Sequence, residues 1–423
     1  MSGVFRIMPA LVLLTAAAVP ARAQDAATVR RMRGDAEWLS ADAREGRLTG
    51  TAGMRAAADW VARRFRESGL APGVGKEWFH DFPIAKDAPG IQGSGLDSLP
   101  GLQGRNVIGF LRGKDARLRD EVVVIGAHYD HLGRGVVGSL DGRGEIHNGA
   151  DDNASGTVTL VEIARLLAKK PPRRSVIFIA FSGEEEGLLG STAYVRAPVV
   201  PMDRTLAMLN LDMVGRMREN RIMALGVETA VELRALLDSA NRIANLDIAA
   251  SGDGYGASDH QSFYLAKRPV LHFFTGSHED YHRAGDDAAK LDVAGMGRIA
   301  QLTADLARVL ADRTAPLTFV DRPPPAPVAG GGRGYGAWFG SIPDMTGGGP
   351  GVRFSGVSPG SPAEKAGLRA DDVLLRLGAF DIKDLQAMTD ALRTMKPGDT
   401  VATVIRRGTK VDTIQVVLGR RGG

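Results

Sequence analysis

The sequence contains no cysteine among its 423 residues. Disulfide bonds, thiolate metal ligands and a lipid attached to a cysteine are therefore excluded. Stability must come from apolar cores instead. A chain of this length with 44% hydrophobic residues is too long for one ordinary domain, so we expect two or more.

A large excess of charge of one sign is also missing. The chain has 53 basic and 49 acidic residues, a net charge of +4. Loss of residues 1–23, which include Arg6 and Arg22 and no acid, would leave 51 basic against 49 acidic residues. Such a balance is no electrostatic footprint for nucleic acid or an anionic membrane, and we expect neither as a partner.

The longest apolar run lies at the N-terminus. Arg6 precedes "IMPALVLLTAAAV", and "ARA" follows as a small-residue cleavage site. This pattern is typical of a signal peptide over residues 1–23, cleaved after Ala23. A membrane-spanning helix fits less well, because the run is short and is bracketed by Pro9 and Pro20. We expect an exported, periplasmic or secreted protein with no membrane anchor.

Apolar runs of strand length alternate with helical stretches through the first three quarters of the chain. Helical spacing is clear at 56–70, 154–169 and 229–244, and the predicted strands are "NVIGFL" (106–111), "EVVVIGAHYD" (121–130), "SVIFIAFSGEEEG" (175–187), "LAMLNLDMVG" (206–215) and "VLHFF" (270–274). Continuously apolar strands that alternate with helices predict an α/β fold with a mostly parallel sheet covered on both faces.

The composition changes at 321–334, "DRPPPAPVAGGGRG". Proline followed by glycine is typical of a linker. Residues 335–423 then read as short strands with one helix near 384–395, which predicts a small β-rich domain after a first domain over 24–320.

Potential metal ligands recur where the apolar runs end. They are His128 and Asp130 in "AHYDH", Asp151 in "GADDNASG", Glu184 to Glu186 in "FSGEEEG", Asp212 in "NLDM" and His282 in "DYHRAGDD". In an open α/β sheet these strand ends meet at one crevice. Each residue alone could be a helix cap, a solvated turn or a buried histidine, but together they indicate a site.

Histidine and carboxylate ligands suit zinc, and also manganese or cobalt. Five ligands exceed the three that one catalytic zinc usually takes from a protein, so we expect two metal ions. A carboxylate then bridges them at about 3.5–4 Å separation. We assign the bridge to Asp151, with the neighbouring Asp152 holding the loop.

The motifs in "AHYDH", "GADDNASG", "FSGEEEGLLGS", "NLDMVG", "GYGASDHQSF" and "DYHRAGDD" occur in the order found in the M28 zinc aminopeptidases. Over roughly 35–312 the chain resembles that family, which implies a two-zinc hydrolase that removes N-terminal residues from peptides. The resemblance implies that His128, Asp151 and Asp212 hold one metal, and that Asp151, Glu185 and His282 hold the other.

The same resemblance assigns roles around the metals. Glu184 would be the general base, with Glu185 a ligand and Glu186 a bystander. Asp130 would orient His128 by fixing its tautomer, and Tyr255 would assist the tetrahedral intermediate. The resemblance also predicts a cis peptide bond between Asp151 and Asp152.

Three rival classes differ in metal content or chain layout. The related M20 carboxypeptidases usually insert a lid domain, for which the 70 positions from Asp212 to His282 leave no room. Glutaminyl cyclases tend to depart from "GADDNASG" and use one metal. Non-catalytic proteins on this scaffold have usually lost ligands.

Residues 335–423 resemble a PDZ domain of the bacterial, protease-associated kind. "YGAWFGSI" (335–342) is similar to its carboxylate-binding loop and groove strand, and "VSPGSPAEKAGLRADDVLLRLGAF" to its central motif. Backbone N–H groups of Trp338, Phe339 and Gly340 would then capture a C-terminal carboxylate, while the peptide adds as a strand beside Ile342. A spacer domain with an empty groove is the alternative.

Overall fold

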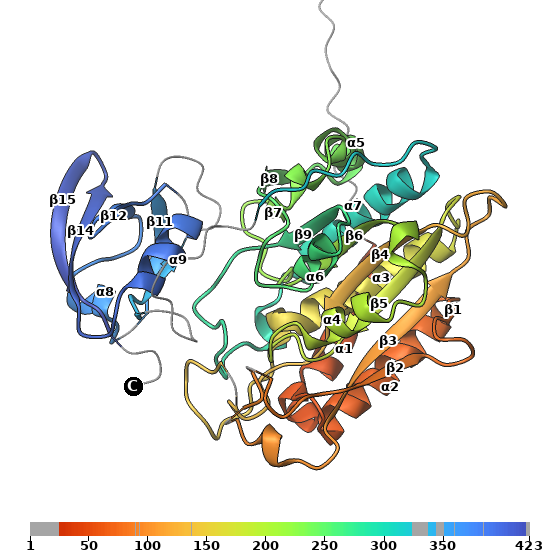
Figure 1. Cartoon of the computed structure of the whole chain (residues 1–423), viewed down its shortest axis with the longest axis horizontal. Coiled ribbons are helices and arrows are strands. Elements are labelled where there is room, and N and C mark those ends of the chain that lie inside the picture. Colours follow the sequence, from red (N-terminus) through yellow and green to blue (C-terminus); the bar gives the residue numbers. More distant parts are fainter. Residues whose placement is uncertain are drawn as a thin grey trace, which may run out of the picture.

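The computed structural model describes residues 25–323 except 89, 93 and 137, residues 337–343, and residues 351–419 except 359 and 384. The predicted signal peptide and most of the predicted linker lie outside the described residues. Two sheets define two units, a large one and a small one (Figure 1).

The larger sheet contains nine strands in the order β1-β3-β5-β4-β6-β9-β7-β8, with β2 paired to β3. Its strands are β1 (Ala71–Pro72), β2 (Phe79–Pro83), β3 (Gln103–Leu111), β4 (Val122–His128), β5 (Ser175–Phe181), β6 (Thr205–Leu211), β7 (Arg221–Leu225), β8 (Asp247–Ser251) and β9 (Val270–Phe274). The central strands β5, β4, β6 and β9 are parallel, whereas β3 and β7 join them antiparallel. The predicted α/β class is therefore confirmed, with antiparallel strands flanking the parallel centre.

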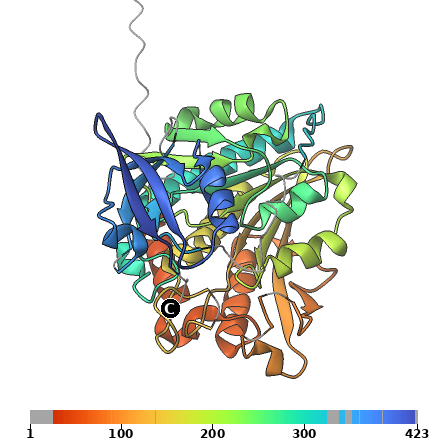
Figure 2. The same ribbon diagram turned by 60° about the vertical axis from the view of Figure 1, so that its left-hand side comes forward.

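Helices cover both faces of this sheet (Figures 1 and 2). One face is covered by α2, α3 and α7, against which α1 and α5 pack, and the other by α4 and α6. The helices are α1 (Ala26–Leu39), α2 (Ala52–Glu67), α3 (Gly156–Ala168), α4 (Leu189–Arg196), α5 (Leu233–Ala244), α6 (His260–Leu265) and α7 (Val293–Asp312).

Helix α2 illustrates how the sequence forms these elements. The Thr51 hydroxyl accepts a hydrogen bond from the Met54 N–H and caps the first turn. Apolar residues at helical spacing, among them Ala58, Val61 and Phe65, are fully buried. The stripe they form faces the sheet, as an amphipathic helix requires.

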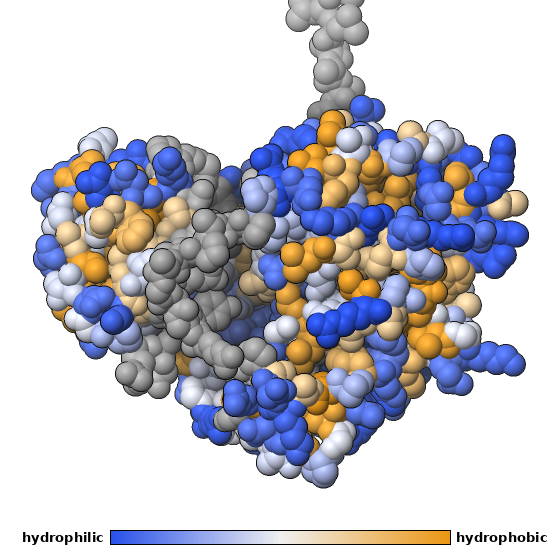
Figure 3. All heavy atoms as spheres, in the orientation of Figure 1, coloured by the Kyte–Doolittle hydropathy of each residue, from blue (hydrophilic) through white to orange (hydrophobic). Residues whose placement is uncertain are grey.

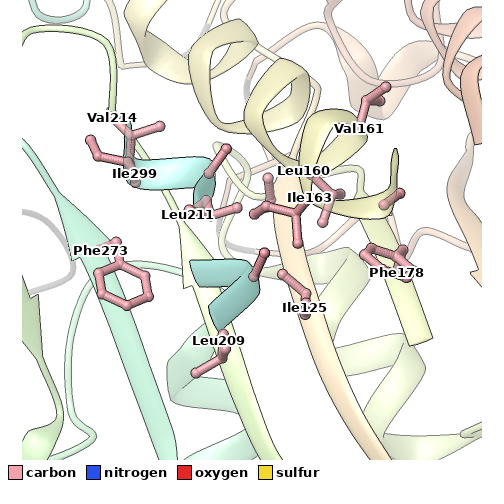
Figure 4. Close-up of a cluster of buried hydrophobic side chains, with 14 of the residues drawn as sticks. Ile125, Leu160, Val161, Ile163, Phe178, Leu209, Leu211, Val214, Phe273 and Ile299 are labelled. Atoms are coloured by element: carbon pink, nitrogen blue, oxygen red, sulfur yellow. The ribbon is translucent and has the colours of Figure 1, made fainter. Parts of the chain in front are cut away.

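Strand β4 is buried along its whole length, and its side chains alternate between two cores. Val123 and Ile125 join the core on the α3 and α7 face, while Val122 and Val124 join the core on the opposite face. Figure 4 shows the first of these cores, where Leu160 and other residues of α3 lie over the sheet. This double burial explains the continuous apolar run in the sequence.

The strand order reverses beside β4. From β4 the chain crosses to β5 on one side, and β6 then returns to the other side of β4. Ligands in open α/β sheets bind at the carboxyl ends of the strands at such a reversal. His128 is the last residue of β4 and lies at this point.

The small unit is a six-stranded antiparallel sheet in the order β10-β11-β12-β14-β15, with β13 paired to β12. Its elements are β10 (Ser341–Pro343), β11 (Val352–Val357), α8 (Pro362–Lys365), β12 (Val373–Leu377), β13 (Phe380–Asp381), α9 (Leu385–Thr394), β14 (Thr400–Arg407) and β15 (Lys410–Val417). Its own core includes Phe339, Phe354, Leu374 and Ile405. The unit thus packs around an interior separate from that of the large sheet.

Among the described residues, every helix is too short or too polar to span a membrane. On the face shown in Figure 3, hydrophilic and hydrophobic side chains are interspersed.

Candidate metal centre

Side chains from four strand ends meet at the crevice beside β4. His128 ends β4, Glu184 and Glu185 follow β5, Asp212 follows β6 and His282 follows β9. Their side chains range from 1% to 14% exposed. The five residues that the sequence pattern selected at these positions are therefore brought together.

The central carboxylate of this cluster belongs to Asp152. One of its oxygens lies 3.4 Å from Nε2 of His128, and the other lies 3.3 Å from Nε2 of His282. On the first side, His128 Nε2 is also 3.2 Å from Oδ1 of Asp212. On the second side, His282 Nε2 is 3.1 Å from Oε2 of Glu185. Asp152 thus faces two groups, each completed by one imidazole and one further carboxylate.

Asp151 does not face this cluster, so its predicted bridging position is wrong by one residue. Its Oδ1 accepts a hydrogen bond of 2.6 Å from the Gly215 N–H, and its Oδ2 lies 3.1 Å from Nε2 of His278. Neighbouring side chains in the turn Ala150–Ser155 point in different directions, and the turn directs Asp152 into the crevice. Asp151 instead anchors the loop, the role predicted for Asp152.

Asp286 fixes the direction of this turn. Its Oδ2 accepts hydrogen bonds from the backbone N–H groups of Asp151 and Asp152, at 2.8 and 3.0 Å. Its Oδ1 receives one from Arg216 at 2.9 Å. The cis peptide bond also differs from the prediction by one residue, since it joins Asp152 to Asn153.

Arg47 holds the same turn from the other side. Its side chain is fully buried and donates hydrogen bonds to the carbonyls of Leu39, Tyr129, Asn148 and Gly149. Burial lowers the pKa of Arg47 to about 10, against the opposing attraction of Asp130 and other acids. The guanidinium ties the segment after His128 to the segment before Asp151.

The glutamates after β5 differ in their environments. Burial raises the pKa of Glu184 well above its usual range, and repulsion from Glu185 and Asp212 adds to this against the attraction of His128. Burial also opposes the charge of Glu185, but the attraction of His282 and hydrogen bonds from His131 and His282 lower its pKa to about 2. Two adjacent carboxyl groups with separated pKa values suit a proton carrier and a permanently charged ligand.

Glu186 lies outside the cluster, although it is 1% exposed. Its Oε2 accepts a 2.8 Å hydrogen bond from the Thr49 hydroxyl. Burial raises its pKa well above the usual range, with Asp130 and Glu185 adding repulsion. It belongs to the packing behind the site.

The carboxylate of Asp130 lies behind His128 but beyond hydrogen-bond reach of its ring, so the predicted orienting role stays a prediction. Its Oδ1 is 3.8 Å from His128 Nδ1, and its backbone carbonyl is closer, at 3.3 Å. Its Oδ2 accepts a 3.3 Å hydrogen bond from the Glu185 N–H. Burial raises its pKa to about 6, against the attraction of His128. Asp130 therefore contacts both a histidine and the glutamate loop.

Among the described residues, the Tyr255 hydroxyl makes no hydrogen bond to a residue of the cluster. Its hydroxyl donates to the carbonyl of Arg322 at 3.1 Å, and its ring packs edge-on against Tyr264, 5.0 Å between centroids. The hydroxyl is therefore engaged by the segment that leads into the linker.

Other polar residues around the site were not singled out from the sequence. Ser258 donates a 2.8 Å hydrogen bond to Oδ2 of Asp212. Asp259 is fully buried, and burial raises its pKa to about 7, against the attraction of His128. His131 lies 2.7 Å from Glu185. All three lie inside motifs already noted in the sequence, His131 in "AHYDH" and Ser258 and Asp259 in "ASDHQ", so membership of these motifs was their sequence signal.

The residues present fit divalent metal ions. Ligand atoms of His128, Asp152 and Asp212 lie within 4.8 Å of one another, as do those of His131, Asp152 and Glu185. The buried site holds an excess of carboxylates over cationic side chains, a condition that is costly without a compensating positive charge. Imidazole and carboxylate donors without sulfur are a zinc-type set.

Comparison with known families agrees with this geometry. Residues 106–307 match the model of peptidase family M28, and residues 340–418 match the model of the PDZ domain. The chain carries an M28 peptidase domain followed by a PDZ domain.

Relatives of the M28 domain are named as peptidases. An aminopeptidase of Bacillus subtilis is 32% identical over 180 residues, which cover 41% of this chain and 36% of that protein. A probable zinc metalloprotease of Leptosphaeria maculans is 33% identical over 168 residues, covering 39% and 35%. The chain thus spans about a third of the length of these relatives.

Solved structures share the fold. A zinc aminopeptidase of Bacillus subtilis has a TM-score of 0.53 at 18% identity, covering 66% of this chain and 94% of that structure. A glutaminyl cyclase of Bacteroides thetaiotaomicron has a TM-score of 0.52 at 17% identity, covering 66% and 97%. The fold therefore does not by itself separate a peptidase from a cyclase.

In the PDZ domain, the N–H groups that could bind a carboxylate differ in part from those predicted. The Trp338 N–H is already bonded to the Gly419 carbonyl at 2.8 Å, so it is not free to bind a peptide. The N–H groups of Phe339 and Gly340 donate no hydrogen bond in the described part of the chain. Strand β10, which contains Ile342, is an edge strand of the sheet, where a peptide strand could add.

Proposed function

We propose that the M28 domain is a two-metal aminopeptidase that removes N-terminal residues from peptides. The observation that carries the proposal is the position of Asp152, whose two oxygens face two separate imidazole and carboxylate pairs. A carboxylate in this position suits a bridge between two metal ions. His128, Asp152 and Asp212 would hold one ion, and Asp152, Glu185 and His282 the other.

When bound, the metal ions would polarise the scissile carbonyl and lower the pKa of a water molecule. Glu184 would take the proton of the attacking water and return it to the leaving amine. Burial raises its pKa above the usual range, which makes Glu184 a better proton acceptor than an exposed glutamate. Asp130 and Ser258 would orient His128 and Asp212.

Aminopeptidase activity is favoured over the rival activities by the ligand set. All five positions keep an imidazole or a carboxylate, which a non-catalytic scaffold would not need. A glutaminyl cyclase would use one metal, for which the second group around Glu185 is superfluous. Support for N-terminal rather than C-terminal cleavage comes from the relatives named as aminopeptidases.

Metal analysis and activity on one sample test this proposal. We expect two zinc ions per chain and hydrolysis of aminoacyl amides, with no hydrolysis after acetylation of the amino group. Manganese or cobalt should restore activity to protein stripped of zinc. One metal per chain with cyclisation of N-terminal glutamine would favour the cyclase, and no metal would favour a binding protein.

The proposal extends to export of the protein and to peptide binding by the PDZ domain. The N-terminal sequence favours export to the periplasm or the medium, and mass spectrometry of the mature N-terminus would test cleavage after Ala23. The PDZ domain would bind C-terminal peptide segments through Phe339, Gly340 and strand β10. Titration with peptides carrying a free or an amidated C-terminus would test that binding, because only the free carboxylate should be captured.

A further inference from the structure

His131 contacts the metal centre without belonging to the predicted ligand set. It lies three residues after the end of β4, and its side chain is fully buried. Its Nδ1 is 2.7 Å from Oε1 of Glu185, whereas Oε2 of Glu185 is 3.1 Å from Nε2 of His282. One carboxylate therefore lies between two imidazoles, one at each oxygen.

These contacts determine where His131 carries its proton. Its Nε2 is buried and has no hydrogen-bond partner among the residues the structure describes. A proton on Nε2 alone would bury an unpaired donor and leave a lone pair of Nδ1 facing a carboxylate oxygen. A proton on Nδ1 removes both penalties. Nδ1–H then donates a charge-assisted hydrogen bond to Glu185.

Close packing prevents the ring of His131 from moving. A Cβ atom at Gly149, where φ is +54°, would come within 2.4 Å of Cδ2 of His131, so the backbone lies directly against the ring. The ring of His282 packs edge-on against it, 5.9 Å between centroids. The backbone N–H of His131 also bonds the carbonyl of Arg47 at 3.4 Å. A confined ring can fix the rotation of the carboxylate that it contacts.

We propose that His131 positions Glu185 for one of the two metals and is not itself a ligand. Its Nδ1 is 4.0 Å from Oδ2 of Asp152, while Nε2 of His282 is 3.3 Å from the same oxygen. His282 therefore shares the metal position with Asp152. His131 contacts the other oxygen of Glu185, Oε1, which faces away from His282. Glu185 would bind through Oε2 alone. This inference rests on the proposed metal centre.

Three variants test the inference. His131→Phe keeps a buried ring and removes the donor, while His131→Asn places an amide N–H close to the position of Nδ1. His80→Phe is the control, because His80 lies on β2 and its neighbours in the described part of the chain are Asn106, Phe82 and Tyr194, none of which belongs to the metal centre. Zinc affinity of each site would be measured by competition with a chelator, and the number of imidazole ligands by X-ray absorption.

We expect His131→Phe to weaken one zinc site about 10–100-fold, as loss of an outer hydrogen bond to a ligand does, and to leave the other unchanged. His131→Asn should recover most of this loss, and His80→Phe should show none. The imidazole count should stay the same in all variants.

Four results would overturn the inference. They are unchanged affinities in His131→Phe, equal weakening of both sites, failure of His131→Asn to recover, and loss of one imidazole ligand, which would make His131 a ligand. A wild-type protein that binds no zinc would instead refute the proposed function.

Discussion

Exchange of the two neighbouring aspartates tests the arrangement of the metal centre most directly. In Asp152→Asn the side chain keeps its size, but an amide nitrogen replaces one of the two oxygens that face His128 and His282. Both metal positions then lose a charged ligand. We expect the affinity of both sites to fall by more than the roughly 10–100-fold that follows loss of an outer contact.

The size of the effect on stability follows from the linkage between binding and folding. A ligand present at 100 times its dissociation constant stabilises the folded state by about 2.7 kcal/mol. A 100-fold loss of affinity should therefore remove roughly that amount of zinc-dependent stabilisation for each metal. Thermal unfolding with and without zinc, together with metal content after dialysis, would measure it.

Asp151→Asn should behave in the opposite way. Its side-chain oxygen can still accept from the Gly215 N–H, but the charged contact to His278 is lost. Loss of one buried charge-assisted hydrogen bond costs about 1–3 kcal/mol. The melting temperature of the metal-free protein should fall by roughly 2–12 °C, and zinc content should stay at two per chain. If Asp151→Asn released the metals while Asp152→Asn retained them, the turn would have the register that the sequence predicted, and our account would be wrong.

The remaining predictions concern the proton carrier, the domain boundary and the PDZ domain. Glu184→Gln should keep both metals and slow turnover by a factor on the order of 10² to 10⁴, whereas Glu185→Gln should lower metal content. The reverse pattern in metal analysis and kinetics would make Glu185 the proton carrier and Glu184 the metal ligand. A chain ending after Pro323 should keep full activity on small aminoacyl amides but show a higher KM for long peptides with a free C-terminus. A chain ending at Asp321 also lacks the Arg322 carbonyl, which accepts the hydrogen bond of the Tyr255 hydroxyl. A lower kcat in the shorter chain alone would show that this contact of Tyr255 matters for turnover. Asp372→Asn should destabilise the PDZ domain by about 1–2 kcal/mol at pH 7, because Asp372 accepts two hydrogen bonds of 2.6 Å from the partly exposed Arg407. Although burial opposes it, Arg407 lowers the pKa of Asp372. The contribution of Asp372 is therefore fully present above the unfolded pKa of about 3.9 and is lost as the pH falls through the lower folded pKa. Thermal unfolding should show a smaller difference between wild type and variant at pH 3 than at pH 7.

The fold was predictable because burial on both faces of the sheet leaves a continuous signal. The runs around Ile125, Phe178 and Leu209 are apolar without alternation, which only a strand covered on both sides requires. The flanking strands β7 and β8 were missed because β7 has only three buried residues and β8 is partly exposed, so neither forms an apolar run as long as those of the central strands. The two strands join the sheet through the antiparallel pairing of β7 with β9, which is a long-range contact that no local sequence pattern encodes.

The sequence predicted which loops line the crevice, but not which aspartate of the turn Ala150–Ser155 points into it. Strand ends converge by topology, so His128, Asp212 and His282 could be placed together from the sequence. The choice between Asp151 and Asp152 depends on contacts of the turn with Asp286, 135 and 134 residues away. His131 and His278 escaped notice for a related reason, since each acts through a partner that is distant in the sequence.

The contacts of Arg47 and Asp286 have a consequence for folding order. Arg47 bonds carbonyls 82 and 102 residues further along the chain, and Asp286 bonds amides about 135 residues before it. Contacts so far apart in sequence form slowly, because the entropy of closing each loop must first be overcome. The turn that presents Asp152 is therefore completed only when both ends of the domain have docked. A nascent chain that has not yet reached Asp286 has no assembled centre, so zinc capture should be a late event in folding, and a fragment that contains all the motifs up to Asp212 should take up no metal with native affinity.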